Sequence, residues 1–140
     1  MQLEPLIDFY QNLTPASVAD FGSFYSDDAY FKDPFNEVRG LTAIQRIFTH
    51  MFSQVTEPRF VITAKVGAGD TAMLVWELGF RTRRLGHKEA MILRGMSHLR
   101  FDAAGKVCFH RDYWDTAEEL YMKLPLLGGV LRGLRKALSA

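Results

Sequence analysis

Apolar residues in the first half of the chain recur at intervals of three and four positions, the spacing of one helix face. The pattern predicts three helices, whose apolar members are Leu3, Leu6, Ile7 and Tyr10, then Val18, Phe21, Phe24 and Tyr25, then Leu41, Ile44, Ile47, Phe48, Met51 and Phe52. The second helix should open at Thr14 and Pro15, because a hydroxyl cap followed by proline is typical of a helix start. The apolar arc of the third helix is wide enough to cover a sheet.

The second half of the chain changes to the pattern of β-strands. The strands predicted after Pro58 are 59–66, 71–84, 87–101 and 106–114. The segments between them are short and contain glycine, which favours antiparallel hairpins, so we expect a meander. A short strand at 29–32 should precede it and end at Asp33 and Pro34, because proline excludes continued central pairing.

The last strand should lead into a helix at Asp115, since Glu118 completes a capping-box pattern in which Asp replaces Ser or Thr. Leucines then repeat in alternating steps of three and four, at Leu124, Leu127, Leu131, Leu134 and Leu138. Residues 116–140 are therefore expected to form an amphipathic helical extension that packs on the domain formed by residues 1–115 or on a second subunit. Its basic residues, Arg132, Arg135 and Lys136, leave binding to a membrane surface as an alternative.

Composition narrows the class of protein. A chain of 140 residues with 48% hydrophobic and 24% charged residues suits one folded domain. The formal net charge is +1, so nothing in the charge balance recommends nucleic acid as a partner. The single cysteine, Cys108, excludes an internal disulfide and fits a reducing compartment. We expect a cytoplasmic protein, because the sequence has no basic leader and no apolar stretch of membrane-spanning length.

The final predicted strand carries the side chains with the most chemistry. Because successive side chains of a strand point to opposite faces, His110, Asp112 and Trp114 share one face. That face offers an imidazole and a carboxylate beside an aromatic ring. The sequence contains no phosphate-binding glycine motif, no dinucleotide fingerprint and no metal-ligand spacing, so it indicates neither a cofactor nor a metal.

Four blocks of residues occur in a characteristic order along the chain. They are Phe24–Ala29 leading to Asp33-Pro34, Gly40 with Ala43-Ile44 and Phe48, Trp76-x-Leu78-x-Phe80, and Ser97–Asp102 with Gly105–Val107. From about Phe9 to Asp115 the chain resembles the nuclear transport factor two superfamily, which includes ketosteroid isomerases and SnoaL-like polyketide cyclases. The resemblance implies an α+β fold: a cone-shaped, curved antiparallel sheet wrapped around a cavity, with three N-terminal helices and a C-terminal helical tail.

Compared with the isomerases of that superfamily, the chain keeps one site residue and lacks others. Asp33 matches the general base. Phe9 stands where the oxyanion tyrosine is expected, Ser97 replaces the protonated aspartic acid, and Phe48 replaces a supporting tyrosine. The missing donors argue against classical steroid isomerisation. Tyr10 lies about 100° around the helix from the lost phenol, so it should not substitute for it.

The resemblance implies that the last strand faces the cavity, which makes Asp33, His110 and Asp112 the candidates for proton transfer. The side chains expected to bind the ligand are Phe9, Ile47, Met51, Trp76, Leu78, Phe80, Ser97 and Trp114. Two hypotheses follow. The protein is a cofactor-independent enzyme of the cyclase, dehydratase or isomerase kind that acts on a small hydrophobic molecule, or it is a module of the same fold that binds a ligand or a protein without turnover.

Each candidate also has a plainer interpretation. Asp33 can be a turn former that binds its own backbone. His110 can be a core histidine with its hydrogen bonds satisfied, and Asp112 can be ion-paired with an arginine, for which Arg94 is the best-placed candidate. The two tryptophans can be general core aromatics.

The sheet face opposite the cavity is expected to carry apolar side chains. Strand alternation places Met73, Val75, Phe109 and Tyr113 on that face. Members of the superfamily commonly dimerise through it. We therefore expect these side chains to meet a second subunit in a homodimer, or to meet the third helix.

Overall fold

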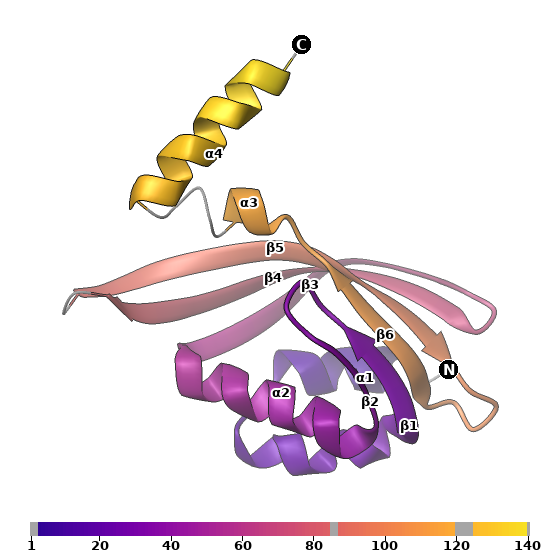
Figure 1. Cartoon of the computed structure of the whole chain (residues 1–140). Coiled ribbons are helices and arrows are strands. Elements are labelled where there is room, and N and C mark those ends of the chain that lie inside the picture. Colours follow the sequence, from indigo (N-terminus) through magenta and orange to yellow (C-terminus); the bar gives the residue numbers. More distant parts are fainter. Residues whose placement is uncertain (1–2, 85–86, 120–124, 140) are drawn as a thin grey trace.

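The structure is a computed structural model that describes residues 3–84, 87–119 and 125–139 (Figure 1). Its helices are α1 (Leu3–Gln11), the 3₁₀ helix η1 (Ala16–Ser23), α2 (Leu41–Gln54), α3 (Thr116–Glu119) and α4 (Pro125–Leu138). Its strands are β1 (Tyr25–Lys32), β2 (Glu37–Arg39), β3 (Thr56–Ala68), β4 (Thr71–Arg84), β5 (His87–Phe101) and β6 (Val107–Tyr113). The predicted α+β class is confirmed. The predicted turn at 85–86 and Leu124 of the predicted tail lie outside the described residues.

The six strands form one curved, open sheet in the order β2-β1-β6-β5-β4-β3. Strands β3 to β6 pair antiparallel in chain order, which confirms the predicted meander. The expectation of an entirely antiparallel sheet is wrong at one pair, because β1 runs parallel to β6. The physical reason is the long connection between them. After β1 the chain crosses to the far edge of the sheet through α2, and the meander then returns it to the side of β1.

The second predicted helix is shorter than its apolar pattern suggests. The pattern assigns Tyr25 to that helix, but η1 ends at Ser23 and Tyr25 begins β1. The 3₁₀ geometry of η1 is used in short pieces, and pairing with Val107 of β6 takes over at Tyr25. The side chain of Tyr25 is fully buried there. Its position on a strand is what later aims its hydroxyl at the candidate site.

Helix α2 is fixed on the sheet through the residue that precedes it. Gly40 precedes the helix with φ 107°, a conformation that favours glycine, and its N–H donates to the carbonyl of Ala29 at 2.8 Å. From there α2 runs across the sheet with Ile44 and Phe48 buried against it. The helix therefore covers the same face as α1 and η1 (Figure 1).

Two apolar clusters lie between these helices and the sheet. The larger one is a packed core that includes Leu6, Ile7, Phe21, Tyr25, Phe31, Ile44, Phe48, Leu74 and Leu99. The second consists of Trp76, Leu78, Phe80 and Leu93, farther along β4 and β5. The layer is thus densely filled near β1 and β6, and the candidate site lies between the two clusters.

The opposite face of the sheet carries none of α1, η1 and α2 (Figure 1). Val61, Val75 and Tyr113 are exposed on it. The expectation that this face meets the third helix is wrong, because α2 packs on the other side. Helix α3 begins as predicted, since Asp115 Oδ1 accepts a hydrogen bond from the Glu118 N–H at 3.0 Å. Helix α4 then extends away from the sheet, and no described helix is long and apolar enough to cross a membrane.

Candidate functional site

Strands β5 and β6 direct three polar side chains toward the helices. In their antiparallel register Ser97 lies opposite Asp112, and His110 lies opposite Leu99. On its other side His110 is paired with Phe31 of β1, and the two ring centroids lie 4.8 Å apart. The period of two along β6 therefore gives His110 and Asp112 the same interior face, as the sequence predicts.

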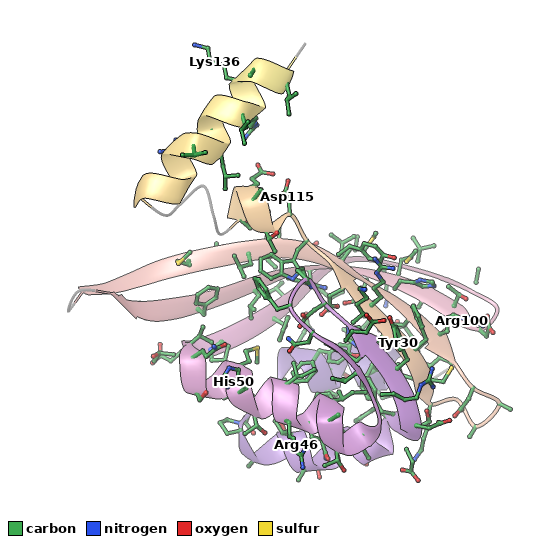
Figure 2. The ribbon with its side chains drawn as sticks, viewed as in Figure 1. Tyr30, Arg46, His50, Arg100, Asp115 and Lys136 are labelled. Atoms are coloured by element: carbon green, nitrogen blue, oxygen red, sulfur yellow. The ribbon has the colours of Figure 1, made fainter. Side chains whose placement is uncertain are left out.

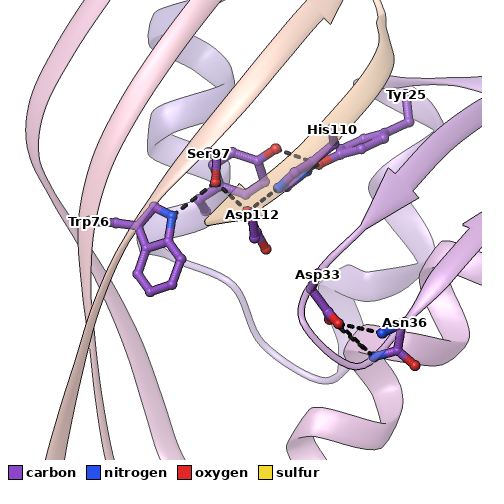
Figure 3. A network of polar contacts seen from close by, with 8 residues as sticks. Tyr25, Asp33, Asn36, Trp76, Ser97, His110 and Asp112 are labelled. Atoms are coloured by element: carbon purple, nitrogen blue, oxygen red, sulfur yellow. Dashed lines mark hydrogen bonds and ion pairs between the residues drawn. The ribbon is translucent and has the colours of Figure 1, made fainter. Parts of the chain in front are cut away.

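The carboxylate of Asp112 is held by two side chains (Figure 3). Ser97 Oγ donates to Asp112 Oδ1 at 2.5 Å, and His110 Nε2 lies 2.6 Å from the same oxygen. Ser97 in turn accepts a hydrogen bond from Trp76 Nε1 at 2.9 Å. Since Ser97 and His110 are both buried, this end of the network is shielded from water.

Two tyrosines continue the network on the far side of the imidazole. Tyr25 Oη lies 2.6 Å from His110 Nδ1, and the Tyr25 hydroxyl is also hydrogen-bonded to the Tyr10 hydroxyl. Both phenols are buried. The network therefore links α1, β1, β4, β5 and β6, because these elements carry Tyr10, Tyr25, Trp76, Ser97 and the β6 pair.

With a neutral imidazole, the hydrogen bonds can run in one direction only. The Asp112 carboxylate accepts, so His110 Nε2 carries its proton and donates it to Oδ1. His110 Nδ1 then accepts from Tyr25, whose oxygen accepts from Tyr10. Every donor in the network thus points toward Asp112. This arrangement stabilises a negative charge on that carboxylate.

Burial raises the pKa of Tyr25 well above the ordinary phenol value, and negative charge on neighbouring groups adds to the rise. Desolvation likewise raises the pKa of Tyr10, although its hydrogen bond with Tyr25 acts in the opposite direction. Both phenols therefore stay protonated near neutral pH and act as donors.

An apolar pocket of about 640 Å³ opens beside the network, a volume within the range of small-molecule sites. Its apolar walls are Phe31, Phe35, Val38, Ala43, Ile47, Phe48, Met51, Val55, Phe60, Trp76, Leu78, Phe80, Met91, Leu93 and Trp114. Arg46, His50 and Gln54 line it from α2 and are exposed, so they mark its solvent-facing rim. Figure 2 shows Arg46 and His50 on that helix.

Asp112 is the point where the polar network meets the pocket. It lines the large pocket and also a small cavity of about 20 Å³ shared with Ser97, His110 and Tyr10. Among the described residues, hydrogen bonds to Asp112 use Oδ1, and Oδ2 points away from both partners (Figure 3). The side chain keeps 17% of its surface exposed. One carboxylate oxygen is therefore held in place while the other is open to a ligand.

Asp33 lines the same pocket but is engaged by its own turn. Its Oδ1 accepts from the N–H groups of Phe35 and Asn36, both at 2.7 Å, and the Asn36 amide contacts both carboxylate oxygens at 3.1 Å. Within the described part of the chain no hydrogen bond joins Asp33 to His110 or Asp112 (Figure 3). The structure therefore brings together two of the predicted acid/base residues and leaves Asp33 apart as a turn former.

The arginine proposed as a partner of Asp112 lies elsewhere. Arg94 is 3.8 Å from Glu77 and 3.8 Å from Glu119. It stands on the outer side of β5, because its strand partner Glu77 alternates away from the buried Trp76. The ion-pair interpretation of Asp112 therefore does not describe this structure.

Most of the predicted ligand contacts line the large pocket: Ile47, Met51, Trp76, Leu78, Phe80 and Trp114. Ser97 lies deeper, in the small cavity. Phe9 is not a lining residue of either cavity, because it stacks on Phe24 at 4.6 Å and packs edge-on against Phe21 at 5.1 Å. The prediction that Phe9 of α1 forms part of the pocket wall is therefore wrong.

Tyr10 and Tyr25 are the network members that the sequence interpretation missed. Helical rotation away from Phe9 was the reason to set Tyr10 aside, yet that rotation is what turns its hydroxyl toward Tyr25. The usable signal was the buried stripe that Tyr10 shares with Leu6 and Ile7. A buried phenol needs a hydrogen-bond partner, so a tyrosine on such a stripe predicts a polar contact in the core.

Across residues 3–84, 87–119 and 125–139, no group of three His, Cys, Asp or Glu side chains is placed to hold a metal ion. The groups that the site offers are therefore an oriented carboxylate, an imidazole, a hydroxyl and an indole N–H.

Solved structures share this architecture at low identity. A putative SnoaL-like polyketide cyclase from Jannaschia sp. CCS1 is 13% identical, with 83% of this chain and 86% of that chain covered and a TM-score of 0.70. A hypothetical protein with a ketosteroid isomerase-like fold from Catenulispora acidiphila DSM 44928, in complex with trimethylamine, is 15% identical, with 84% of this chain and 88% of that chain covered and a TM-score of 0.69. An LEH-like epoxide hydrolase from M. tuberculosis is 18% identical over 97% and 91%, with a TM-score of 0.65.

At these identities the likeness establishes the fold alone. Among curated protein sequences, none matches this chain. The sequence model described as the SnoaL-like domain matches residues 6–110, from the first turns of α1 to His110 on β6. That span contains most of α1, η1, α2 and the strands up to His110 of β6, together with every network residue except Asp112. The chain accordingly belongs to the SnoaL-like family.

Proposed function

We propose that this protein is a cofactor-independent enzyme that removes a proton from a small, largely apolar organic molecule. The observation that carries the proposal is the state of Asp112. One oxygen is held by His110 and Ser97 inside the protein, the other accepts no hydrogen bond from a described residue, and the side chain lines an apolar pocket of about 640 Å³. Because Ser97 and His110 hold this carboxylate in one position, it needs little reorganisation to accept a proton.

The proposed first step is the transfer of a proton from a carbon of the ligand to Asp112 Oδ2. The C–H bond breaks, its electrons remain on the ligand, and the carboxylate becomes a neutral acid. His110 and Ser97 act here as positioning residues, since both hold Oδ1 and fix the direction of Oδ2. Return of the proton at another atom gives isomerisation, whereas attack of the carbanion on a carbonyl or loss of a leaving group gives cyclisation or elimination.

The pocket favours one orientation of the ligand. Its buried end is formed by Trp76, Leu78 and Phe80, and its exposed rim by Arg46 and His50 of α2. An apolar ring system would occupy the buried end beside Asp112, with a polar substituent directed to the rim. Donors at the rim would also interact with an oxygen that becomes negative in the reaction.

A generic carbon acid tests the proposal without knowledge of the natural substrate. Nitrobenzisoxazole loses one C–H proton to a base while its N–O bond breaks, and the product is a coloured cyanophenolate. We expect the protein to accelerate this elimination and Asp112→Asn to reduce kcat/KM by about a hundredfold or more. Asp28→Asn is the matched control, because Asp28 is an exposed carboxylate on β1. Equal rates for the wild type and Asp112→Asn would refute the assignment.

A module that binds ligands without turnover is the second candidate. It is favoured by one observation, the position of Phe9, which stacks on Phe24 and supplies no hydroxyl to the pocket. In that case quenching of tryptophan fluorescence by an apolar probe such as 1-naphthol would show binding at Trp76 or Trp114, both of which line the pocket, and no elimination would be detected.

We further propose that two copies of the chain pair through the outer face of the sheet. Val61, Val75 and Tyr113 are each more than 40% exposed there, as is Ile92 of β5. Phe109 is partly covered by stacking on Tyr30 at 5.2 Å, so it contributes an aromatic edge to the same face. Light scattering on the eluting protein checks this pairing, and a monomeric mass at micromolar concentration would exclude it.

A further inference from the structure

Helix α4 is separate from the pocket and from the face that the other helices cover. It follows α3 and extends away from the sheet (Figure 1). Val130 is 62% exposed, Leu134 is 54% exposed and Leu138 is 85% exposed. These three residues are spaced by four positions, so they lie along one side of the helix. The helix thus presents an apolar side that the rest of the described chain leaves largely uncovered.

The helix needs an apolar surrounding to be stable. Its 14 residues include Gly128, Gly129 and Gly133, and each glycine inside a helix costs about 1 kcal/mol relative to alanine. Isolated helices of this length are marginal in water even with good helix formers. Burial of the leucine side, which is the side formed by Val130, Leu134 and Leu138, compensates for the free-energy cost of the glycines.

Charge on the other side of α4 is of one sign. Arg132, Arg135 and Lys136 are exposed. Arg135 and Lys136 follow Arg132 by three and four positions, and the helix contains no acidic residue. The formal net charge of the whole chain is +1, so the chain outside α4 has a formal charge of −2. Helix α4 is therefore net positive, whereas the remainder of the chain is net negative. A surface that complements α4 is apolar where it meets Val130, Leu134 and Leu138 and negatively charged where it meets the three cations.

Two other roles fit helix α4 less well. A coiled coil between two copies needs three or more heptads, and α4 contains two. A transmembrane segment needs about 20 apolar residues, and α4 is shorter and carries three cations. A strongly amphipathic helix with leucines on one side and only basic charges on the other is instead typical of helices that lie in the plane of a membrane surface.

We propose that α4 binds the surface of a lipid bilayer that contains anionic lipids. The leucine side enters the boundary between headgroups and acyl chains, and Arg132, Arg135 and Lys136 remain at the level of the phosphates. Figure 2 shows Lys136 near the end of the helix farthest from the domain. Binding would hold the pocket domain next to the bilayer. The proposal concerns a different surface from the pocket and is independent of the proposed chemistry.

The test measures co-flotation of the full chain with vesicles. Vesicles of phosphatidylcholine that contain phosphatidylglycerol should retain the protein, and vesicles of phosphatidylcholine alone should retain about tenfold less. Leu134→Gln combined with Leu138→Gln should weaken retention about tenfold or more. Replacement of all three cations by glutamine should weaken it about a hundredfold. Val66→Gln is the matched control, because Val66 is 68% exposed on β3 and lies outside the tail.

Each result has a defined meaning. Retention that depends on phosphatidylglycerol, on the leucines and on the cations, with Val66→Gln unchanged, supports the proposal. Retention equal on both vesicle types, absence of retention, or an equal loss with Val66→Gln would overturn it. Light scattering is recorded in parallel. If the leucine replacements convert a dimer to a monomer while the wild type ignores vesicles, the leucine side is an interface between copies and the lipid proposal fails.

Discussion

The hydroxyl of Ser97 lies 2.5 Å from Asp112 Oδ1 and, at the same time, 2.9 Å from the indole nitrogen of Trp76. A single buried serine thus connects the wall of the apolar pocket to the carboxylate. The indole donates to the serine, so the serine is free to donate to the carboxylate. The position of the aromatic wall and the position of the base are therefore coupled through one hydroxyl.

Removal of the Ser97 hydroxyl should affect both Trp76 and Asp112. In Ser97→Ala the Trp76 N–H and Asp112 Oδ1 each lose a buried partner, which costs about 1–3 kcal/mol of unfolding free energy. Urea denaturation followed by tryptophan fluorescence measures the change. Ser53→Ala is the control, because Ser53 is exposed near the end of α2 and should change stability by less than about 0.5 kcal/mol. Equal stabilities of the two variants would contradict the coupling.

Gly95 makes room for the same indole. A Cβ at position 95 would lie 2.4 Å from Cη2 of Trp76, well inside van der Waals contact. Gly95→Ala should therefore displace the ring, weaken the Trp76–Ser97 bond and destabilise the protein by about 1–3 kcal/mol. Gly79→Ala on the neighbouring strand β4 is the matched control, since a Cβ there meets nothing within 4 Å. We expect the tryptophan emission to shift in Gly95→Ala and not in Gly79→Ala. Identical emission spectra of the two variants would contradict this prediction.

The buried phenols predict a stability loss at alkaline pH. The pKa of Tyr25 is raised in the folded state by burial, so folded protein binds more protons than unfolded protein above the ordinary phenol value of about 10. Stability is then fully present below pH 10 and falls as the pH rises, by about 1.4 kcal/mol per pH unit for each such phenol. In Tyr25→Phe the decline between about pH 10 and 11.5 should be less steep. Denaturation curves at several pH values measure the slope, and parallel slopes would disprove this linkage.

Two variants of Asp33 distinguish a structural role of this residue from a catalytic one. Asp33→Asn keeps one oxygen that can accept from the Phe35 and Asn36 N–H groups, whereas Asp33→Ala keeps none. We expect Asp33→Ala to lose about 1–2 kcal/mol of stability and Asp33→Asn to lose less. Elimination of nitrobenzisoxazole by Asp33→Asn should stay within a few-fold of the wild type. A loss as large as that of Asp112→Asn would return Asp33 to the role of base.

The sheet was the part of the fold that could be predicted best. Strands β4 and β5 have the bounds that their flanking glycines and alternating side chains predict. The same alternation places His110 and Asp112 on one face of β6. Local rules decide these features, because the side-chain period of a strand and the geometry of a hairpin depend on neighbouring residues only.

The parts that could not be predicted depend on distant residues. The register that sets Ser97 opposite Asp112 includes an irregularity between Arg100 and Phe101, which no local pattern reveals. Tyr25 leaves the helix pattern because β6 pairs with it from 82 positions later in the chain, at Val107. For Asp33 the sequence supplied both interpretations, and the hydrogen bonds from Phe35 and Asn36 in its own turn favour the structural one.

The pairing of β1 with β6 joins residues from opposite ends of the domain, so it can form only after nearly the whole domain has been synthesised. Tyr10 and Tyr25 are synthesised early, whereas His110 and Asp112 are synthesised near the end of the domain. A chain still emerging from the ribosome therefore has its apolar strands but lacks the polar groups that complete the pocket. Ligand binding should therefore appear only at chain lengths that release β6 from the ribosome.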